Sequence, residues 1–239
     1  MSSSPAISAV IPVHNETGFI DTALPRLVQE MESVGESFEI IIAENGSTDD
    51  TADVADRLAA DDGRIQVIRR PDPDYGAAMR DGFQMAKGAW VVNFDIDYFS
   101  ADFLRSALKL HESADVVLAS KRVEGSDDRR SPFRRLGTWG FNKVLRILFR
   151  SQISDTHGMK MIRRAVVDEI VPDVISTQDL FDTELVIRAE RAGRRITEIP
   201  TTVEELRTAR SSFVRRIPRT LRGLWRIRKA LRVEDQLGR

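Results

Sequence analysis

The sequence predicts an α/β fold in which a mostly parallel sheet carries helices on both of its faces. Short apolar runs rich in Ile and Val alternate with amphipathic segments of helical length through the first 120 residues, a pattern typical of repeated β-α units. Polar residues directly follow several of these runs. In parallel sheets ligands bind outside the carboxyl ends of the strands, so the same residues predict a binding crevice.

We expect strands at six places, each an apolar run of four to seven residues: 7–13, 38–43, 65–68, 90–94, 115–119 and 196–200. Amphipathic segments between the first five predict helices at about 17–34, 48–60, 76–86 and 101–111. The second of these helices starts with Asp49 and Asp50, where the helix dipole favours acidic side chains.

Composition adds a few limits. The chain has 239 residues, 41% of them hydrophobic, and no Pro/Gly/Ser-rich linker divides it, so one large domain is expected. No 18-residue apolar run could cross a bilayer, and the first residues lack the basic and apolar parts of a signal peptide. The absence of cysteine excludes disulfides, thiolate catalysis and Cys-ligated zinc. A cytoplasmic location is the simplest expectation.

The most informative motif is Asp95-Ile96-Asp97, which directly follows the expected strand 90–94. Two carboxylates one residue apart at a strand end can share a divalent cation, and their hard oxygens suit Mg²⁺ or Mn²⁺, which bind substrate phosphates as well. The alternative is a solvated turn, where aspartates are common. The residues near the motif therefore decide between a metal site and a solvated turn.

Two further polar clusters are expected at the same edge of the sheet. They are Pro12-Val13-His14-Asn15-Glu16, after the first strand, and Glu44-Asn45-Gly46-Ser47, after the second. These clusters resemble those of family 2 glycosyltransferases of the GT-A (Rossmann-like) fold, whose first strand ends in Pro-x-x-Asn-Glu and whose second ends in Asp-Asp-Gly-Ser-Thr-Asp.

The resemblance implies roles for these residues. The nucleotide of a sugar donor is then bound by Pro12, Val13, Asn15, Glu16, Glu44, Asn45 and Ser47. Its diphosphate lies at the Asp95-Ile96-Asp97 motif and is held through a metal ion on Asp95 and Asp97. Glu44 and Asn45 stand where the family has two aspartates, so the identity of the nucleotide stays open. The helix start at 76–80 resembles the family's Gly-rich helix and adds Arg80, although Tyr75 stands where many relatives have lysine.

Four ordered motifs in the second half narrow the resemblance: 119–122, 154–160, 181–185 and 196–200. Their order is similar to that in dolichyl-phosphate β-glucosyltransferases and dolichol-phosphate mannose synthases, from residue 7 to about 213. The resemblance implies inverting transfer of a hexose from a UDP- or GDP-linked donor to a polyprenyl monophosphate. It also implies that Arg207 lies in a basic loop over the donor diphosphate.

A phosphate acceptor changes what the catalytic residues must do. The second pKa of a phosphate monoester is near 6, so its oxygen is already an anionic nucleophile at neutral pH and needs no strong base. We expect Arg122, Arg134 and Arg135 to bind that phosphate. A hydroxyl acceptor on a polysaccharide or small molecule is the alternative, and Asp182 would then be the base. Asp182 and Asp155 could instead only orient neighbouring groups.

Charge divides the chain into two halves. Residues 1–120 carry 9 Lys and Arg against 21 Asp and Glu, whereas residues 121–239 carry 27 against 16. Basic amphipathic segments at 133–149 and from about 212 predict helices at an anionic membrane interface, with Leu224 and Trp225 in the apolar face of the second. Core packing is the alternative. Nucleic-acid binding is a further alternative that would explain the basic tail, but it does not explain the strand-end clusters.

From these features we expect a catalytic domain at 1–211 and a basic membrane-interface helix at 212–239, either as part of that domain or as an appendage. The protein is then peripheral on the cytoplasmic face of the membrane, and a separate membrane-anchor protein is a plausible partner.

Overall fold

The computed structural model describes residues 4–129, 132–203 and 213–237, except for the side chains at 128, 133, 134, 179, 203 and 213–216. Its strands are β1 Ile7–Val13, β2 Phe38–Asn45, β3 Ile65–Arg70, β4 Trp90–Asn93, β5 Val116–Ser120, β6 Asp127–Asp128, β7 Lys160–Arg163, β8 Ile196–Pro200 and β9 Thr202–Val203. Its α-helices are α1 Ile20–Val34, α2 Thr51–Asp61, α3 Tyr75–Met85, α4 Ala101–Leu108, α5 Pro132–Phe149, α6 Arg164–Ile170, α7 Phe181–Arg191 and α8 Phe213–Gln236.

The main sheet has seven strands in the order β3-β2-β1-β4-β7-β5-β8. All neighbours pair in parallel except β7, which is antiparallel to both β4 and β5. The predicted mostly parallel sheet is therefore confirmed. A small second sheet joins β6 to β9.

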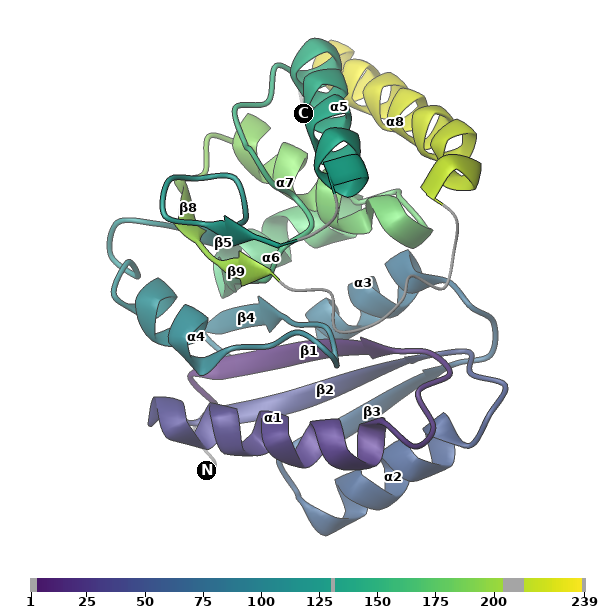
Figure 1. The fold of residues 1–239 in the computed structure, drawn as a ribbon, viewed down its shortest axis with the longest axis vertical. Helices are drawn as coiled ribbons and strands as arrows, with labels where there is room; N and C mark the ends of the chain where they lie inside the picture. The colour runs from purple at the N-terminus through teal and green to yellow at the C-terminus, as the bar shows by residue number, and fades with distance from the viewer. Residues whose placement is uncertain (1–3, 130–131, 204–212, 238–239) are drawn as a thin grey trace.

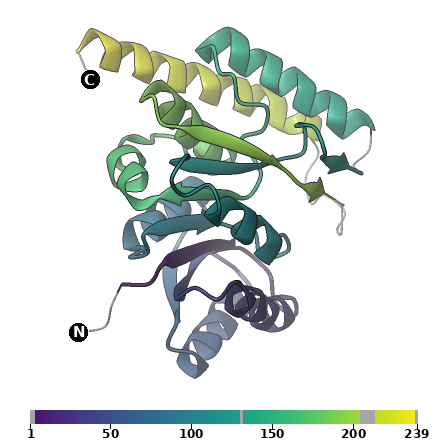
Figure 2. The ribbon, with the colours of Figure 1, turned by 90° about the vertical axis from the view of Figure 1, so that its left-hand side faces the viewer.

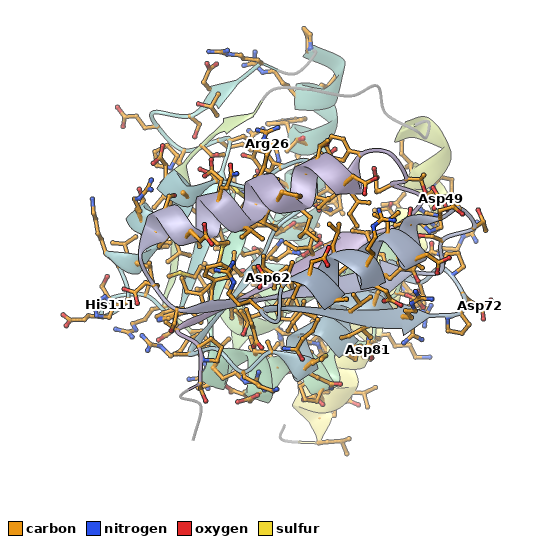
Figure 3. The ribbon with its side chains drawn as sticks, turned by 90° about the horizontal axis from the view of Figure 1, so that it is seen from below. Arg26, Asp49, Asp62, Asp72, Asp81 and His111 are labelled. Carbon is orange, nitrogen blue, oxygen red and sulfur yellow. The ribbon has the colours of Figure 1, made fainter. Side chains whose placement is uncertain are left out.

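Helices cover both faces of the sheet, as predicted. Apolar side chains of α1, α2 and α4 pack on one face, and those of α3, α6 and α7 pack on the other. Figure 1 shows α1 and α2 at one end of the molecule and α5 and α8 at the other. In Figure 3, Asp49 and Asp72, which follow β2 and β3, lie together at one side, and His111, which follows α4, lies at the opposite side.

The sequence analysis missed β7. This strand has only four residues, with Lys160 and Arg163 at its ends, so neither an apolar run nor a clear alternation marks it. Met161 pairs with Val92 of β4 and with Val117 of β5. Because β7 runs against its neighbours, its first residue lies at the carboxyl end of β4, next to the Asp-x-Asp motif.

The last helix is part of a third apolar cluster. This cluster joins α5, α7 and α8 through Leu145, Leu180, Ile187, Leu224, Ile227 and Leu231. Arg188 and Arg191 of α7 also form ion pairs with Glu234 and Asp235 at the end of α8. Figure 2 shows α5 and α8 side by side along one end of the molecule.

This packing corrects the predicted apolar face of α8. Leu224 is fully buried against the protein, whereas Trp225 is 64% exposed. Consecutive helical residues point about 100° apart, so the two cannot share one face. Ile217 and Leu221 are exposed like Trp225, which leaves an apolar stripe at i, i+4 and i+8 on the surface. None of the helices described is both long enough and apolar enough to span a membrane.

Candidate functional site

The turn after β1 and the loop after β2 are joined by hydrogen bonds. Asn15 accepts a hydrogen bond from the backbone N–H of Thr48 at 2.8 Å and donates its own backbone N–H to Ser47 at 3.0 Å. His14 Nδ1 lies 2.8 Å from the backbone carbonyl oxygen of Asn45. The structure thus brings the first two predicted clusters together at the carboxyl ends of their strands.

The second cluster also connects to α3. Glu44 accepts the backbone N–H of Ser47 at 2.6 Å, and Asn45 accepts that of Asp74 at 2.6 Å. Asp74 in turn caps α3 by accepting the N–H of Ala77. These polar side chains shape the loops that form the crevice, in addition to any contact with a donor.

The cluster after β2 requires glycine at position 46, between Asn45 and Ser47. Gly46 has a φ of 61°, and a Cβ there would lie 2.7 Å from the backbone nitrogen of Pro73. A side chain would therefore separate the loop after β2 from the segment that leads into α3.

The remaining predicted donor-binding residues lie in different surroundings. Val13 and Ile96 are buried in the core, and Pro12 is partly buried. The backbone N–H of Glu16 donates to the Thr51 hydroxyl at 2.7 Å, at the start of α2. Arg80 donates to the carbonyl oxygen of Val174 at 2.5 Å, which ties α3 to the segment before α7. A donor contact by Arg80 stays a prediction.

The Asp-x-Asp motif forms a tight turn directly after β4. Asp95 and Tyr98 exchange backbone hydrogen bonds of 3.2 and 3.0 Å. Ile96 points into the core, whereas Asp95 is exposed and Asp97 is partly exposed. The two carboxylates therefore flank a buried anchor and remain accessible from solvent.

A buried network that the sequence analysis did not predict lies next to this turn. Lys160, only 1% exposed, places Nζ 2.8 Å from Asp182 Oδ1 and donates to Asn93 at 3.1 Å. The Tyr75 hydroxyl donates to Asp182 Oδ2 at 2.7 Å. The only available signal was a lysine at the edge of an apolar segment, which is rarely buried unless it is paired.

The network changes the acidity of its members. Burial alone would raise the pKa of Asp182, but Lys160 and Tyr75 more than offset this effect and hold it below its usual value. The pKa of Asp95 is raised to about 6, mainly because its carboxylate group is partly desolvated and also because of the negative charges of Asp182 and Asp97, which outweigh the opposing charges of Lys160 and Lys121. Asp95 thus combines an exposed position with an excess of negative charge.

These properties fit a divalent cation. A cation on Asp95 and Asp97 would relieve their mutual repulsion, and hard carboxylate oxygens suit Mg²⁺ or Mn²⁺. Across the described parts of the chain no group of three or more His, Asp or Glu side chains is placed to hold a metal ion. Two carboxylates at such a site would leave further positions for water and phosphate oxygens.

A second ion pair lies beyond the network. Lys121 and Asp155, both largely buried, approach to 2.7 Å, and Lys121 is close enough to Asp95 to lower its pKa. Glu198 of β8 accepts hydrogen bonds from the backbone N–H groups of Ser154 and Asp155, which holds this loop against the sheet.

Arg122, the residue after Lys121, opens into a pocket of about 390 Å³. Its other lining residues are Ser154 of the loop and Trp139, Asn142, Lys143 and Arg146 of α5. The sequence analysis did not select Lys143 and Arg146. Of the arginines that it did select, Arg135 is exposed in the first turn of α5, the Arg134 side chain is not described, and Arg207 lies outside the described residues.

Similarity to known proteins identifies the family of this chain. The sequence model of the family described as "Glycosyl transferase family 2" matches residues 8–171, more than half of the chain. The chain belongs to glycosyl transferase family 2. The matched segment of this family 2 chain includes all three strand-end clusters, Arg122 and Lys160.

Two similar proteins have curated names. This family 2 chain is 31% identical over 220 residues to "Glycosyltransferase AglD" of Haloferax volcanii, covering 88% of this chain and 35% of that protein. It is 30% identical over 207 residues to "Undecaprenyl-phosphate mannosyltransferase" of Micrococcus luteus, covering 83% and 84%. The chain thus spans about a third of the first relative and most of the second.

Solved structures confirm the GT-A fold. The mannosyltransferase PcManGT of Pyrobaculum calidifontis, solved with GDP-Man and Mn²⁺, matches with a TM-score of 0.65 at 19% identity, covering 97% of this chain and 65% of that one. Glucosyl-3-phosphoglycerate synthase of Mycobacterium tuberculosis, solved with Mn²⁺, UDP and glucosyl-3-phosphoglycerate, has the same TM-score at 18% identity, covering 93% and 78%.

Proposed function

We propose that this protein transfers a hexose from a UDP- or GDP-linked donor to a polyprenyl monophosphate, with inversion at the anomeric carbon. The observation that carries the proposal is the pocket of Arg122, which gathers Lys143 and Arg146 from α5. Arg122 directly follows Lys121, whose charge acts on Asp95. Three cationic side chains beside a site for a sugar donor suit an acceptor that brings its own negative charge.

The donor is bound at the carboxyl ends of β1, β2 and β4. A metal ion on Asp95 and Asp97 would neutralise the diphosphate as it departs. Asn15, Glu44 and Asn45 surround the place where we expect the nucleoside. The two solved structures above, which contain GDP-Man or UDP together with Mn²⁺, support this placement by analogy of fold.

The transfer requires no net movement of a proton. An oxygen of the acceptor phosphate forms a bond to the anomeric carbon, and the bond from that carbon to the diphosphate oxygen breaks, with its electron pair leaving on the nucleoside diphosphate. Because the acceptor is already ionised at neutral pH, Arg122 and Lys143 need only to hold it in line and to screen its charge from the diphosphate.

The alternative, a hydroxyl acceptor, needs a general base. Asp182 was the candidate, but Lys160 and Tyr75 occupy its two oxygens and its pKa is lowered, which makes it a weak base. These contacts favour the phosphate acceptor.

The exposed surface of α5 and α8 suits a lipid. Exposed large apolar side chains lie on α5 and α8, the two helices that run side by side (Figure 2): Leu136, Trp139, Ile147, Ile217, Leu221 and Trp225. Lys143 and Lys229 lie over the rings of Trp139 and Trp225. Apolar and basic side chains together favour an anionic membrane interface, and the name of the Micrococcus luteus relative supports a polyprenyl phosphate.

One assay tests the proposal. The purified protein is incubated with Mg²⁺ or Mn²⁺, a panel of nucleotide sugars, and either polyprenyl phosphate or free polyprenol, and the lipid-linked sugar is detected by mass spectrometry. We expect product only with the phosphate. Arg122→Gln should reduce its formation, whereas the same charge loss at the distant, exposed Lys109 should not. Equally efficient transfer to free polyprenol would contradict the proposal.

A further inference from the structure

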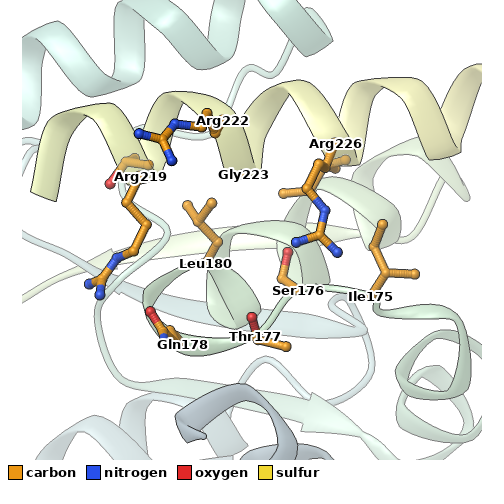
Figure 4. Close-up of a pocket in the computed structure, with 11 residues that line it drawn as sticks. Ile175, Ser176, Thr177, Gln178, Leu180, Arg219, Arg222, Gly223 and Arg226 are labelled. Carbon is orange, nitrogen blue, oxygen red and sulfur yellow. The ribbon is translucent and has the colours of Figure 1, made fainter.

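A second pocket, separate from that of Arg122, lies beneath α8. It has a volume of about 240 Å³ and is lined by one side of α8 and by residues 175–178 and 180, which precede α7 (Figure 4). Gly223 allows the close approach that forms it, because a Cβ at this position would collide with the Leu180 side chain.

Cationic side chains form the helix side of this pocket. Arg219, Arg222 and Arg226 project from α8 at spacings of three and four residues (Figure 4). Like charges at these spacings repel one another and destabilise a helix. Among the described side chains that line the pocket none is acidic, and no described carboxylate forms an ion pair with Arg222 or Arg226; the side chain of Asp179, in the same loop, is not described.

Hydroxyl groups form the opposite side. Ser176 is 92% buried, since only 8% of its surface is exposed, and Figure 4 shows its hydroxyl directed toward Arg226 and α8. Thr177 and Gln178 line the pocket beside it. Guanidinium groups facing hydroxyl and amide groups offer many donors for an oxyanion, and such charge-assisted hydrogen bonds are the strong ones.

We propose that this pocket binds a phosphate group, as a second anion site in addition to the acceptor pocket. The phosphate could belong to a phospholipid headgroup or to a soluble phosphate ester. The exposed rim residue Ile175 and the apolar stripe of Ile217, Leu221 and Trp225 on the same helix favour the headgroup. This choice of source rests on the proposed membrane surface, whereas the anion site itself does not.

A bound phosphate would join α8 to the loop that supports the donor site. The backbone N–H of Gln178 lies 3.4 Å from Asp74, and Arg80 contacts Val174 from the other side. Gly76 lies so close to this loop that a Cβ would be 2.5 Å from the carbonyl oxygen of Ser176. The ligand would therefore stabilise the start of α3, where Tyr75 donates its hydrogen bond to Asp182.

Melting temperatures of the full-length chain test the site. Wild type is titrated with inorganic phosphate, with chloride at equal ionic strength as the reference, because a ligand of the folded state raises the melting temperature. The pocket variant is Arg222→Gln/Arg226→Gln. The matched control is Arg228→Gln/Arg232→Gln, which removes the same charge from the same helix outside the pocket.

We expect wild type and the control to be stabilised by phosphate, and the pocket variant to bind it at least about tenfold more weakly, equivalent to about 1.4 kcal/mol. Arg122→Gln should retain the response of this pocket, which separates it from the acceptor site. Ser176→Ala with Thr177→Val gives a second pocket variant should the arginine variant fail to fold. No phosphate response in wild type, or an equal response in the pocket variants and the control, would overturn the proposal.

Vesicles then identify the source of the phosphate. Weaker binding of the pocket variant than of the control to phosphatidylglycerol vesicles, but not to phosphatidylcholine vesicles, would support a lipid headgroup. Equal vesicle binding together with a lost phosphate response would support a soluble ester. Because neither readout involves sugar transfer, the anion site and the proposed activity can fail independently.

Discussion

The Tyr75 hydroxyl donates a 2.7 Å hydrogen bond to Asp182 and thereby joins the first residue of α3 to the start of α7. Lys160 holds the other carboxylate oxygen from β7 at 2.8 Å. Three elements that are distant in the sequence thus share one buried charge beside the Asp-x-Asp turn. Asp182 consequently acts as a partner for neighbouring groups and is poorly suited to accept a proton.

Removing one member of this network should lower stability. Tyr75→Phe should reduce the free energy of unfolding by about 1.5–3 kcal/mol, the range for a hydrogen bond to a charged group. Lys160→Met should cost about 3–5 kcal/mol, because it leaves Asp182 buried and unpaired. Urea denaturation measures both values.

The combination with Asp182→Asn provides the control for coupling. Lys160→Met should cost less in the Asp182→Asn background than alone, since no charge is then left unpaired. Strict additivity of the two substitutions would contradict the network. If the acceptor is already an anion, Asp182→Asn should also keep substantial turnover at temperatures where it is folded.

Metal binding should depend on pH through Asp95, whose pKa is raised to about 6. A metal ion must displace the proton from this carboxylate, so affinity for Mn²⁺ in the presence of nucleotide should increase from pH 5 to pH 7 and then level off. Calorimetric titration measures this trend. Asp97→Asn should abolish most of the metal-dependent nucleotide binding at every pH, and binding that is unaffected by a chelator would refute the assignment.

The raised pKa of Asp95 has the opposite pH effect on the stability of the metal-free protein, which should decrease as the pH rises. A carboxyl group whose pKa is higher in the folded state stabilises the fold below its unfolded pKa of about 4 and loses that contribution as the pH rises through about 6. Asp95→Asn should therefore melt at a higher temperature than wild type at pH 8 without metal, and this advantage should disappear by pH 4.

Asp115 should contribute stability with the reverse pH dependence. Arg195 donates to it through its backbone and its guanidinium at 2.8–3.1 Å, and Arg163 adds a bond of 3.3 Å. These bonds, mainly those from Arg195, lower the pKa of Asp115. Its contribution is complete above the unfolded pKa of about 4 and is lost as the pH falls through the lower folded value.

Asp115→Asn should thus lower the free energy of unfolding by about 1.5–3 kcal/mol at pH 7, and the deficit should shrink steadily below about pH 4. Denaturation curves across this range measure the effect. Asp102→Asn is a suitable control, because the exposed carboxylate of Asp102 pairs with Arg105 of the same helix, α4. A deficit for Asp115→Asn that is independent of pH would show that its charge is unimportant.

The two sides of α8 should respond differently to substitution. Leu221→Ser with Trp225→Ser should weaken co-sedimentation with anionic liposomes and leave stability nearly unchanged, because both side chains are exposed. Leu224→Ala should cost about 2–5 kcal/mol of stability, because it opens a cavity against α5 and α7. Equal liposome binding by wild type and the double variant would place the membrane surface elsewhere.

The main strands and the three strand-end clusters could be predicted from the sequence. β1 and β8 have the predicted bounds, and β2 to β5 differ by one or two residues at their ends. Long apolar runs are typical of parallel strands that are buried on both faces of the sheet. The Asp-x-Asp motif and its two partner clusters follow from the same rule, since parallel strands end at one edge.

Other features depend on contacts that a linear sequence does not reveal. β7 is short and polar at both ends, and only its antiparallel insertion between β4 and β5 carries Lys160 to Asp182. The division of α8 into a buried and an exposed side depends on where α5 and α7 lie, because both sides are apolar in sequence. The sequence by itself thus determined the sheet and its binding edge, because both follow from local periodicity. The tertiary structure decided which charges are buried together and which apolar residues are exposed to solvent, because burial depends on the neighbours of a residue in space.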